Sequence, residues 1–519
     1  MPLYLGIDSS TQSMTGVVID TDSGSMIAET SINFDEHFGS AYGVTNGVVD
    51  LGQGVVHSYP LMWIDALEAL FEALKRDGCA LGEIAAIAGS GQQHGTVYLN
   101  ASAADTLSGL EPGMPLSQQL QGIFSRKTAP IWMDSSTAQQ CREIEEGVGG
   151  SNRLLNLTGN TAFERFSGPQ IRKFYQDEPE AYEQTAYTGL VSSYVASVLV
   201  GKLVSVDVGD ASGTNMMDIR SKTWSPSALD ATAPGLSDRL TPVTASGSPA
   251  GTIHPYFVAA HGFSSDCTVL PFSGDNPCSL IGLGLVESGH VALSLGTSDT
   301  LFACMAEPRV STEGEGCVFA SPDDAHYMAL ICYMNGSLAR EAVRDQFGLD
   351  WGGFTAALET SLPGNDGKMM LPFFDPEIVP NVGAGVVRRH LEEEDAAGNI
   401  RAVIEAQAVS SHIHSRWMGL DITSLYVTGG ASANEEILKV FANVHGCPVH
   451  RFETTNAAGL GAAIRAYHGH QPSISWPDAC GPFCQPVAGS TIQPDPSTRS
   501  TYDDLIEAYS AFEREHVAS

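Results

Sequence analysis

The sequence predicts an α/β protein of two domains, on three observations. β-rich runs and helical patterns alternate along the chain, which is typical of the α/β class. A pair of β-rich runs around a small polar tip occurs near the start of the chain and again past its middle. The length, 519 residues, exceeds what one hydrophobic core usually serves, and at roughly 150 residues per domain it indicates at least two domains.

The first predicted element is a hairpin. The apolar runs Leu3–Ile7 and Gly16–Ile19 are joined by a short segment of small polar residues, Asp8 to Ser13. Such runs on either side of a polar turn are typical of paired strands. Met26–Ala28 predicts a third strand after the next turn.

A second hairpin of the same kind is predicted downstream. Its strands are Val291–Leu295 and Leu301–Cys304, and its tip begins with Gly296, Thr297 and Ser298. The repeat suggests a duplicated fold whose two tips face a common cleft. Because short hairpins with polar tips are common, the pattern alone also allows two unrelated hairpins.

Between the hairpins, the chain shows helical patterns and a further strand. The helices are predicted at Leu61–Lys75, Ser136–Glu146 and Pro169–Gln176, and the strand at Ile84–Ala88. The segment from Ser246 to Gly251 is rich in Ser, Gly and Pro, which is typical of a connection. We therefore expect a boundary near residue 255, with domains at 1–255 and 256–519.

The C-terminal part alternates between strand and helix. The predicted elements are strand Ser424–Thr428, helix Asn434–Val444, strand Pro448–Phe452 and helix Ala457–His468. A helical pattern also runs from about Asn399 to Met418, and a last one begins near Tyr502. His412 and His414 lie in the first of these patterns, but residues two apart do not share a helix face, so they predict no metal site.

Composition narrows the choice of partners and compartment. The formal net charge of −34 argues against nucleic acid and anionic membranes, which are bound through clustered Lys and Arg. The N-terminus has no basic segment of a secretory signal, and no apolar run approaches the ~18 residues of a membrane span. The ten cysteines are scattered without a Cys-x-x-Cys pair, which favours reduced thiols. We expect a cytoplasmic protein that is a monomer or a homodimer.

The common motifs do not predict nucleotide binding. The chain has no P-loop string, and Gly459 and Gly461 lack the third glycine of a dinucleotide fingerprint. Small residues at the two hairpin tips would nevertheless let backbone N–H groups reach phosphate oxygens. Asp8, at the end of the first strand, would be placed to hold a hydrated Mg²⁺ beside them. Gly429 and Gly430, before a helix, would let a base or ribose approach the backbone.

Asp275 lies in the string Phe-Ser-Gly-Asp-Asn-Pro, directly after the apolar run Cys267–Phe272. Gly-Asp-Asn-Pro is ordinary turn chemistry, so the string by itself favours a turn at the end of a strand. The alternative is a base held in a cleft. The residues of this string alone do not decide between the two.

Seven segments of the chain resemble those of the FGGY carbohydrate kinases, which share the actin-like ATPase fold. LGIDSSTQSMTGVVID, VALSLGTSDTLF and LYVTGGASANEEIL resemble the two phosphate segments and the adenosine segment of that family. GQQHGTVYLN, PIWMDSST, FERFSGPQIRK and FSGDNPCSLIGLGL are similar to its eukaryotic-type xylulokinase branch. The resemblance extends to about residue 470 and keeps the order of the family's segments.

The resemblance implies a fold and an activity. The fold would be two actin-like, ribonuclease H-like domains flanking a cleft, with the sugar-binding domain at 1–255 and the nucleotide-binding domain at 256–519. The activity would be ATP-dependent phosphorylation of D-xylulose to D-xylulose 5-phosphate, with ATP and Mg²⁺ as cofactors.

The resemblance also implies a role for each matching residue. Asp275 would be the general base that takes the proton from the sugar hydroxyl, and Asp8 would serve the metal. The other expected substrate-binding residues are Asn276, His94 and Arg165. The residues expected to bind the nucleotide and its phosphates are Thr11, Gly296, Thr297, Ser298, Trp351, Gly429, Gly430 and Asn434.

Two positions depart from the family pattern. Ser136 stands where many members have an Arg, two residues after the Asp of Trp-Met-Asp, so no role is carried over to it. Asp210 lies in an Asp-Ala-Ser string without the Arg that usually follows, and we do not count it among the catalytic residues. Trp132 is expected in the core. Arg165, next to Glu164, has the alternative of an ion-paired surface residue.

Three other functions are alternatives to a D-xylulose kinase. A kinase of another ketopentose or of a polyol, such as ribulose or glycerol, needs similar polar residues, and the sequence separates it poorly. A non-catalytic actin-like protein that binds nucleotide as a switch would have no need of Asp275 as a base. A dehydrogenase would need the fingerprint that is missing here.

Overall fold

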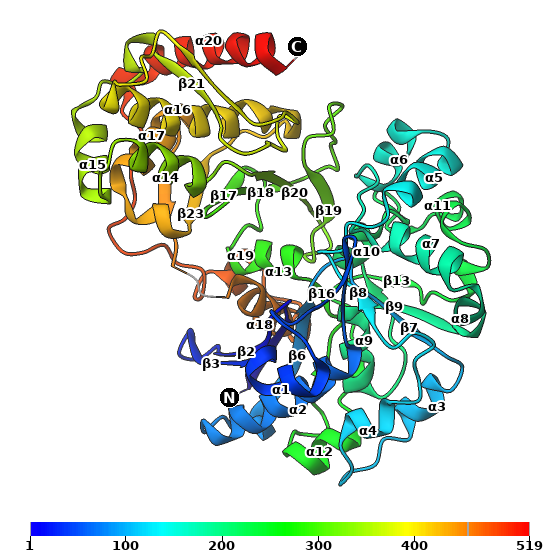
Figure 1. Cartoon of the computed structure of the whole chain (residues 1–519). Helices are drawn as coiled ribbons and strands as arrows, with labels where there is room; N and C mark the ends of the chain where they lie inside the picture. Colours follow the sequence, from blue (N-terminus) through cyan, green and yellow to red (C-terminus); the bar gives the residue numbers. More distant parts are fainter. Residues whose placement is uncertain (1, 454–455, 518–519) are drawn as a thin grey trace. The chain divides into compact units, whose positions relative to one another are not determined.

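The structure, a computed structural model that describes residues 2–453 and 456–517, confirms the α/β class. Strands and helices alternate along most of the chain (Figure 1). The chain forms two units: the first runs to Val286 and resumes at Val318–Tyr327 and Asn456–Cys484, and the second holds the rest. Among the described residues, no helix combines the length and the apolar character needed to cross a membrane. None of the ten cysteines, all of which lie within the described residues, forms a disulfide.

The first change of unit follows Val286, which differs from the predicted boundary near residue 255. Residue 255 begins helix α12 (Pro255–His261), inside the first unit. Two later strands, β15 (Thr268–Val269) and β16 (Ser273–Gly274), pair with β6 (Ile84–Gly91) of the first sheet. The segment rich in Ser, Gly and Pro is therefore a connection within this unit.

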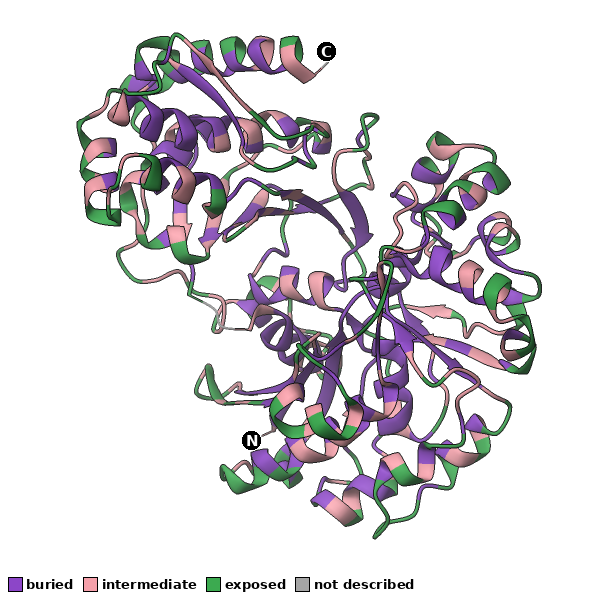
Figure 2. Cartoon of the chain, in the orientation of Figure 1, coloured by how far each residue is buried: buried purple, intermediate pink, exposed green. Residues whose placement is uncertain are grey.

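Strand β1 (Leu3–Ser9) of the first unit is buried over its whole length. It pairs antiparallel with β2 (Ser13–Asp20) and parallel with β6, and β3 (Ser25–Asn33) continues the sheet beyond β2. Successive side chains of a strand point to opposite faces, and here both faces are covered by helices. Figure 2 shows the central strands of this sheet, β1, β2 and β6, buried, whereas β3 at its edge is largely exposed.

Helix α18 (Ala457–His470) covers one face of this sheet at very short range. A Cβ atom on Gly6 would come within 2.0 Å of the carbonyl oxygen of Gly459, so only glycine fits there. The same helix contacts α13 (Asp275–Gly282), where a Cβ on Gly461 would lie 1.9 Å from the carbonyl oxygen of Cys278. Helix α18 thus fixes α13, whose first residue is Asp275, against the end of the sheet.

The second unit repeats the local arrangement of the first. Strand β17 (His290–Leu295) pairs antiparallel with β18 (Asp299–Met305) and parallel with β23 (Ser424–Thr428). In the first unit, β1 pairs in the same two ways with β2 and β6. The two predicted hairpins therefore occupy corresponding places in two sheets, as a duplicated fold would place them.

The helices of the second unit lie close to their predicted positions. The helix after β23, α17 (Glu435–His445), begins one residue after Asn434, which caps it. The predicted helix from Asn399 to Met418 is α16 (Ala396–His414), which ends earlier than expected. The last helix, α20, covers Arg499–Val517.

Candidate active site

Asp275 is the first residue of α13 and directly follows β16. Its Oδ1 accepts hydrogen bonds from the backbone N–H of Asn276, at 2.8 Å, and of Gln93, at 3.3 Å. No other described residue donates to its Oδ2. Burial raises the pKa of Asp275 to about 6, and the backbone hydrogen bonds oppose the rise. A carboxylate with one available oxygen and a pKa close to neutrality is suited to general-base catalysis.

Asn276 and Gln93 contact this carboxylate, and His94 directly follows Gln93 in the chain. Asn276 Nδ2 donates to Gln93 Oε1 at 3.0 Å and to Asp275 Oδ1 at 3.2 Å. His94 Nδ1 donates to the carbonyl oxygen of Gly213 at 2.7 Å. Burial, and next to it Arg165, lower the pKa of His94 to about 3, so its ring is neutral at pH 7. His94 Nε2 is therefore an acceptor suited to a hydroxyl group.

Arg165 lies in the short segment before helix α7 (Ser167–Asp177). Its guanidinium carbon lies 5.2 Å from the ring centre of Phe163 and 5.9 Å from that of Phe166. No carboxylate within the described parts of the chain forms an ion pair with it, so the alternative of an ion-paired surface residue is not observed. Phe166 in turn stacks on His94, with ring centres 4.2 Å apart. Arg165 therefore belongs to the same polar region as His94.

Asp8, near the end of β1, forms a second carboxylate site. Ser90 Oγ donates to its Oδ1 at 2.7 Å, and no described residue donates to its Oδ2. Burial, followed by the charge of Asp275, raises the pKa of Asp8 to about 7. The hydroxyl of Ser9 is also buried without a partner in the described chain. Two carboxylates with available oxygens form a donor set that fits Mg²⁺, because its charge would relieve their repulsion.

The tip of the first hairpin holds Thr11, whose Oγ1 accepts a 2.7 Å hydrogen bond from Trp132 Nε1. Trp132 is 45% exposed, so the prediction that it belongs to the core is wrong. The backbone N–H groups of Thr11 and Gln12 have no acceptor among the described residues. The tip thus offers unpaired N–H groups to an anion.

The tip of the second hairpin is held from behind by a buried ion pair. Arg340 donates two 2.9 Å hydrogen bonds to Asp299 and a third, of 3.2 Å, to the carbonyl oxygen of Gly296. Within the described chain, the backbone N–H groups of Thr297 and Ser298 have no acceptor. Both tips therefore present backbone donors, as phosphate binding requires.

A cavity of about 870 Å³ opens beside this second tip. Five of the residues predicted to bind nucleotide line it: Gly296, Thr297, Trp351, Gly430 and Asn434. Its volume suits a nucleotide-sized ligand. The structure does not place Ser298 or Gly429 in its lining.

The turn after β23 explains the glycine pair. Gly429 has φ +86°, and a Cβ atom there would lie 2.6 Å from the carbonyl oxygen of Leu295. Gly430, in contrast, faces open space, with nothing within 4 Å of its Cβ position. Asn434 uses its Oδ1 to cap α17 and its Nδ2 to donate to Thr355 at 2.9 Å. Gly429 forms the turn, whereas Gly430 leaves room in the cavity.

Residues 127–282 match the N-terminal domain of the FGGY family of carbohydrate kinases, and residues 291–470 match its C-terminal domain. The chain belongs to the FGGY family of carbohydrate kinases. The "Xylulose kinase" of Mus musculus is 40% identical over 98% of this FGGY chain and 94% of its own length. "Xylulose kinase 2" of Arabidopsis thaliana is also 40% identical, over 90% of this chain and 87% of its own.

Solved structures of other proteins have the same FGGY kinase fold. A crystal structure described as a xyloylose kinase from Brucella ovis superposes with a TM-score of 0.83 at 22% identity, over 100% of both chains. The break between the two FGGY domain matches, after residue 282, lies close to the change of unit after Val286. Membership of a kinase family implies the use of ATP.

Two features of this FGGY chain were missed in the sequence. Trp132 contacts the first tip, although an aromatic residue after an apolar run is typical of a core. Asp210 is buried, with its Oδ1 unpartnered among the described residues and its Oδ2 accepting from Ser192. Both residues lie in strings that resemble the family's, and this resemblance was the signal that the sequence offered for them.

Proposed function

We propose that the protein transfers the γ-phosphoryl group of ATP to the terminal hydroxyl of D-xylulose and so forms D-xylulose 5-phosphate. The observation that carries the proposal is the carboxylate of Asp275, which has one available oxygen and accepts hydrogen bonds from the backbone N–H groups of Asn276 and Gln93, the residue before His94. A base at this place is what a hydroxyl acceptor needs. The similarity to xylulose kinases along nearly the whole chain supports this sugar.

In the proposed reaction, Asp275 Oδ2 takes the proton as the hydroxyl oxygen bonds to phosphorus and the bond to ADP breaks. Asn276, His94 and Arg165 bind the sugar. Mg²⁺, held from Asp8, would neutralise phosphate charge, which is most of what phosphoryl transfer requires of a protein. The two tips would hold the phosphates through Thr11, Gly296, Thr297 and Ser298. Trp351, Gly429, Gly430 and Asn434 would form the adenosine site.

We further propose that the enzyme works in the cytoplasm as a monomer or a homodimer. Ten cysteines that form no disulfide within the described residues suit a reducing compartment. A kinase for another ketopentose or for a polyol is the alternative within the same chemistry. A nucleotide switch without catalysis would leave the available oxygen of Asp275 without a purpose.

The test is ADP release with D-xylulose, ribulose, glycerol and gluconate as acceptors. We expect D-xylulose to lead by at least about tenfold in kcat/KM, or roughly 1.4 kcal/mol of transition-state binding. Equal or faster turnover of another acceptor would remove the sugar assignment. If no acceptor leads to ADP release, the proposed kinase activity is wrong.

A further inference from the structure

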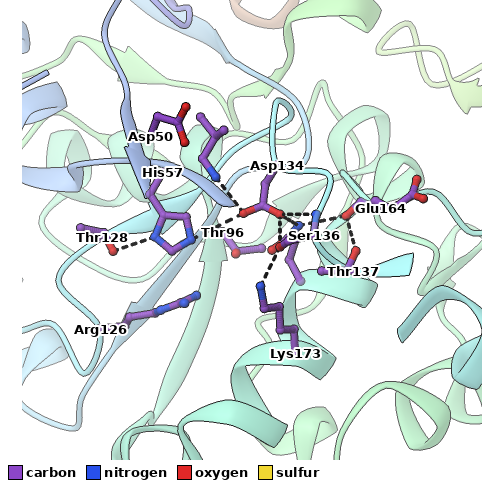
Figure 3. A network of polar contacts seen from close by, with 12 residues as sticks. Asp50, His57, Thr96, Arg126, Thr128, Asp134, Ser136, Thr137, Glu164 and Lys173 are labelled. Atoms are coloured by element: carbon purple, nitrogen blue, oxygen red, sulfur yellow. Dashed lines mark hydrogen bonds and ion pairs between the residues drawn. The ribbon is translucent and has the colours of Figure 1, made fainter. Parts of the chain in front are cut away.

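Asp134 joins separate parts of the first unit, although no role has been assigned to it. It is 1% exposed and accepts hydrogen bonds from four donors (Figure 3). These are Val56 N–H, Ser136 N–H, Ser136 Oγ and, at 2.8 Å, Gln170 Nε2. A buried carboxylate with this many bonds has a fixed orientation.

The negative charge of Asp134 is compensated by a lysine of helix α7, which acts through a serine. His57 Nε2 lies 3.7 Å away, but burial, and next to it Arg126, lower the pKa of His57 to about 4, so the ring is neutral at pH 7. Lys173, on α7, instead donates at 2.7 Å to Ser136 Oγ, which itself donates to Asp134. The hydroxyl group of Ser136 therefore links the ammonium group of Lys173 to the carboxylate of Asp134.

Gln170 forms hydrogen bonds both to Asp134 and to the segment that contains Arg165. Gln170 Nε2 also donates to the carbonyl oxygen of Glu164, at 2.9 Å. Thr137 Oγ1 donates to that same oxygen at 2.6 Å. Arg165 is the next residue, and it has no ion-pair partner of its own in the described chain. Its backbone is thus held from two sides by groups that depend on Asp134 and its loop.

We propose that Asp134 is a positioning residue for sugar binding, which acts by holding Arg165 through Gln170 and the backbone of Glu164. The proposal rests on the proposed function, because it takes Arg165 as a sugar contact. The competing explanation is that Asp134 only stabilises its own turn, in which its N–H donates to the carbonyl oxygen of Ile131. The two explanations differ in what happens once Arg165 is absent.

The test is a double-mutant cycle on the full chain, measured with D-xylulose and ATP. Asp134→Asn keeps the size of the side chain but replaces one acceptor oxygen by an NH2 group, which would face a hydrogen-bond donor, and Arg165→Gln removes the charge of the guanidinium group. We expect Asp134→Asn to raise the KM for D-xylulose about 10-fold and to change kcat less than about 3-fold, as loss of a charged hydrogen bond in the ground state would. The double variant should be within about 2-fold of Arg165→Gln alone.

Two further variants keep the result interpretable. Gln170→Met removes the hydrogen bonds from Gln170 to Asp134 and to Glu164 but leaves the other hydrogen bonds of Asp134. It should therefore raise the KM for D-xylulose in the same way, even if Asp134→Asn does not fold. The matched control is Glu68→Gln, because Glu68 accepts hydrogen bonds from Leu116 N–H and Tyr256 O–H, away from this network. This variant should leave kcat and the KM for D-xylulose unchanged. Effects that multiply, or a lower melting temperature with a normal KM, would overturn the proposal. If the wild type prefers another sugar, the proposed substrate fails, and the same cycle with that sugar still decides the role of Asp134.

Discussion

The backbone N–H of Gln93 donates a 3.3 Å hydrogen bond to Oδ1 of Asp275, although 182 positions separate the two residues. The turn that follows β6 thereby orients this carboxylate. Asp275→Asn keeps an oxygen for that bond but removes the base. We expect kcat to fall by at least about 10²-fold, with ATP affinity changed only a few-fold, because a positioned base contributes ~10²- to 10⁴-fold. Steady-state kinetics and ATP titration on one preparation check this, and a variant that keeps more than about a tenth of wild-type turnover would contradict it.

The pH dependence of the reaction should report the same group. Asp275 must be ionised to accept a proton, and burial raises its pKa to about 6. We therefore expect kcat/KM for the sugar to fall about tenfold per pH unit below roughly pH 6. An acid limb near pH 4, the ordinary range of an Asp, would argue against Asp275 as the base.

The carboxyl of Asp8 should reduce stability when it is ionised. Its pKa is about 7 when folded, against 3.8 when unfolded, so the folded state binds the proton more tightly and stability falls as pH rises between these values. Asp8→Asn should therefore melt higher than wild type at pH 8, by about 2–4 °C per kcal/mol recovered, and the gap should close near pH 4.

Addition of MgCl2 at pH 8 should raise the melting temperature of the wild type but not of Asp8→Asn, since the cation binds only the folded carboxylate. Differential scanning fluorimetry measures both effects. An equal response of the two proteins to MgCl2 would place the metal elsewhere.

The glycine pair after β23 offers a matched test of the nucleotide cavity. Gly430→Ala adds a methyl group to open space, so the melting temperature should be unchanged while the KM for ATP rises about 5- to 10-fold, as for a lost contact of ~1 kcal/mol. Gly429→Ala meets the carbonyl oxygen of Leu295 at φ +86° and should lower the melting temperature itself. An unchanged KM for ATP in Gly430→Ala would exclude the nucleotide from that side of the cavity.

Local patterns predicted the elements around the site well. The predicted strand Ser424–Thr428 coincides with β23, and both polar tips lie between paired strands as expected. These elements carry their information locally, in apolar runs and in the small residues that end them. The predicted third strand at Met26–Ala28 was too short, because β3 continues through polar residues to Asn33.

Long-range pairing was the part that local patterns missed. The segment rich in Ser, Gly and Pro before residue 255 has the composition of a linker, but β15 and β16 return to β6 after it. The same holds at the site, where Trp132 reaches Thr11 and Asp134 is tied to Gln170. Nothing in the spacing of these residues predicts such contacts, since their partners come from other elements.

The closeness of Gly6 and Gly459 has a consequence for how the protein is made. Strand β1 leaves the ribosome among the first segments, but α18, which covers one of its faces, is translated only after most of the chain. Domains usually fold as they emerge, in order from the N-terminus. The first unit cannot do so, and its sheet must keep an apolar face uncovered through most of synthesis. A nascent chain stalled before residue 457 would therefore be a natural client for chaperones.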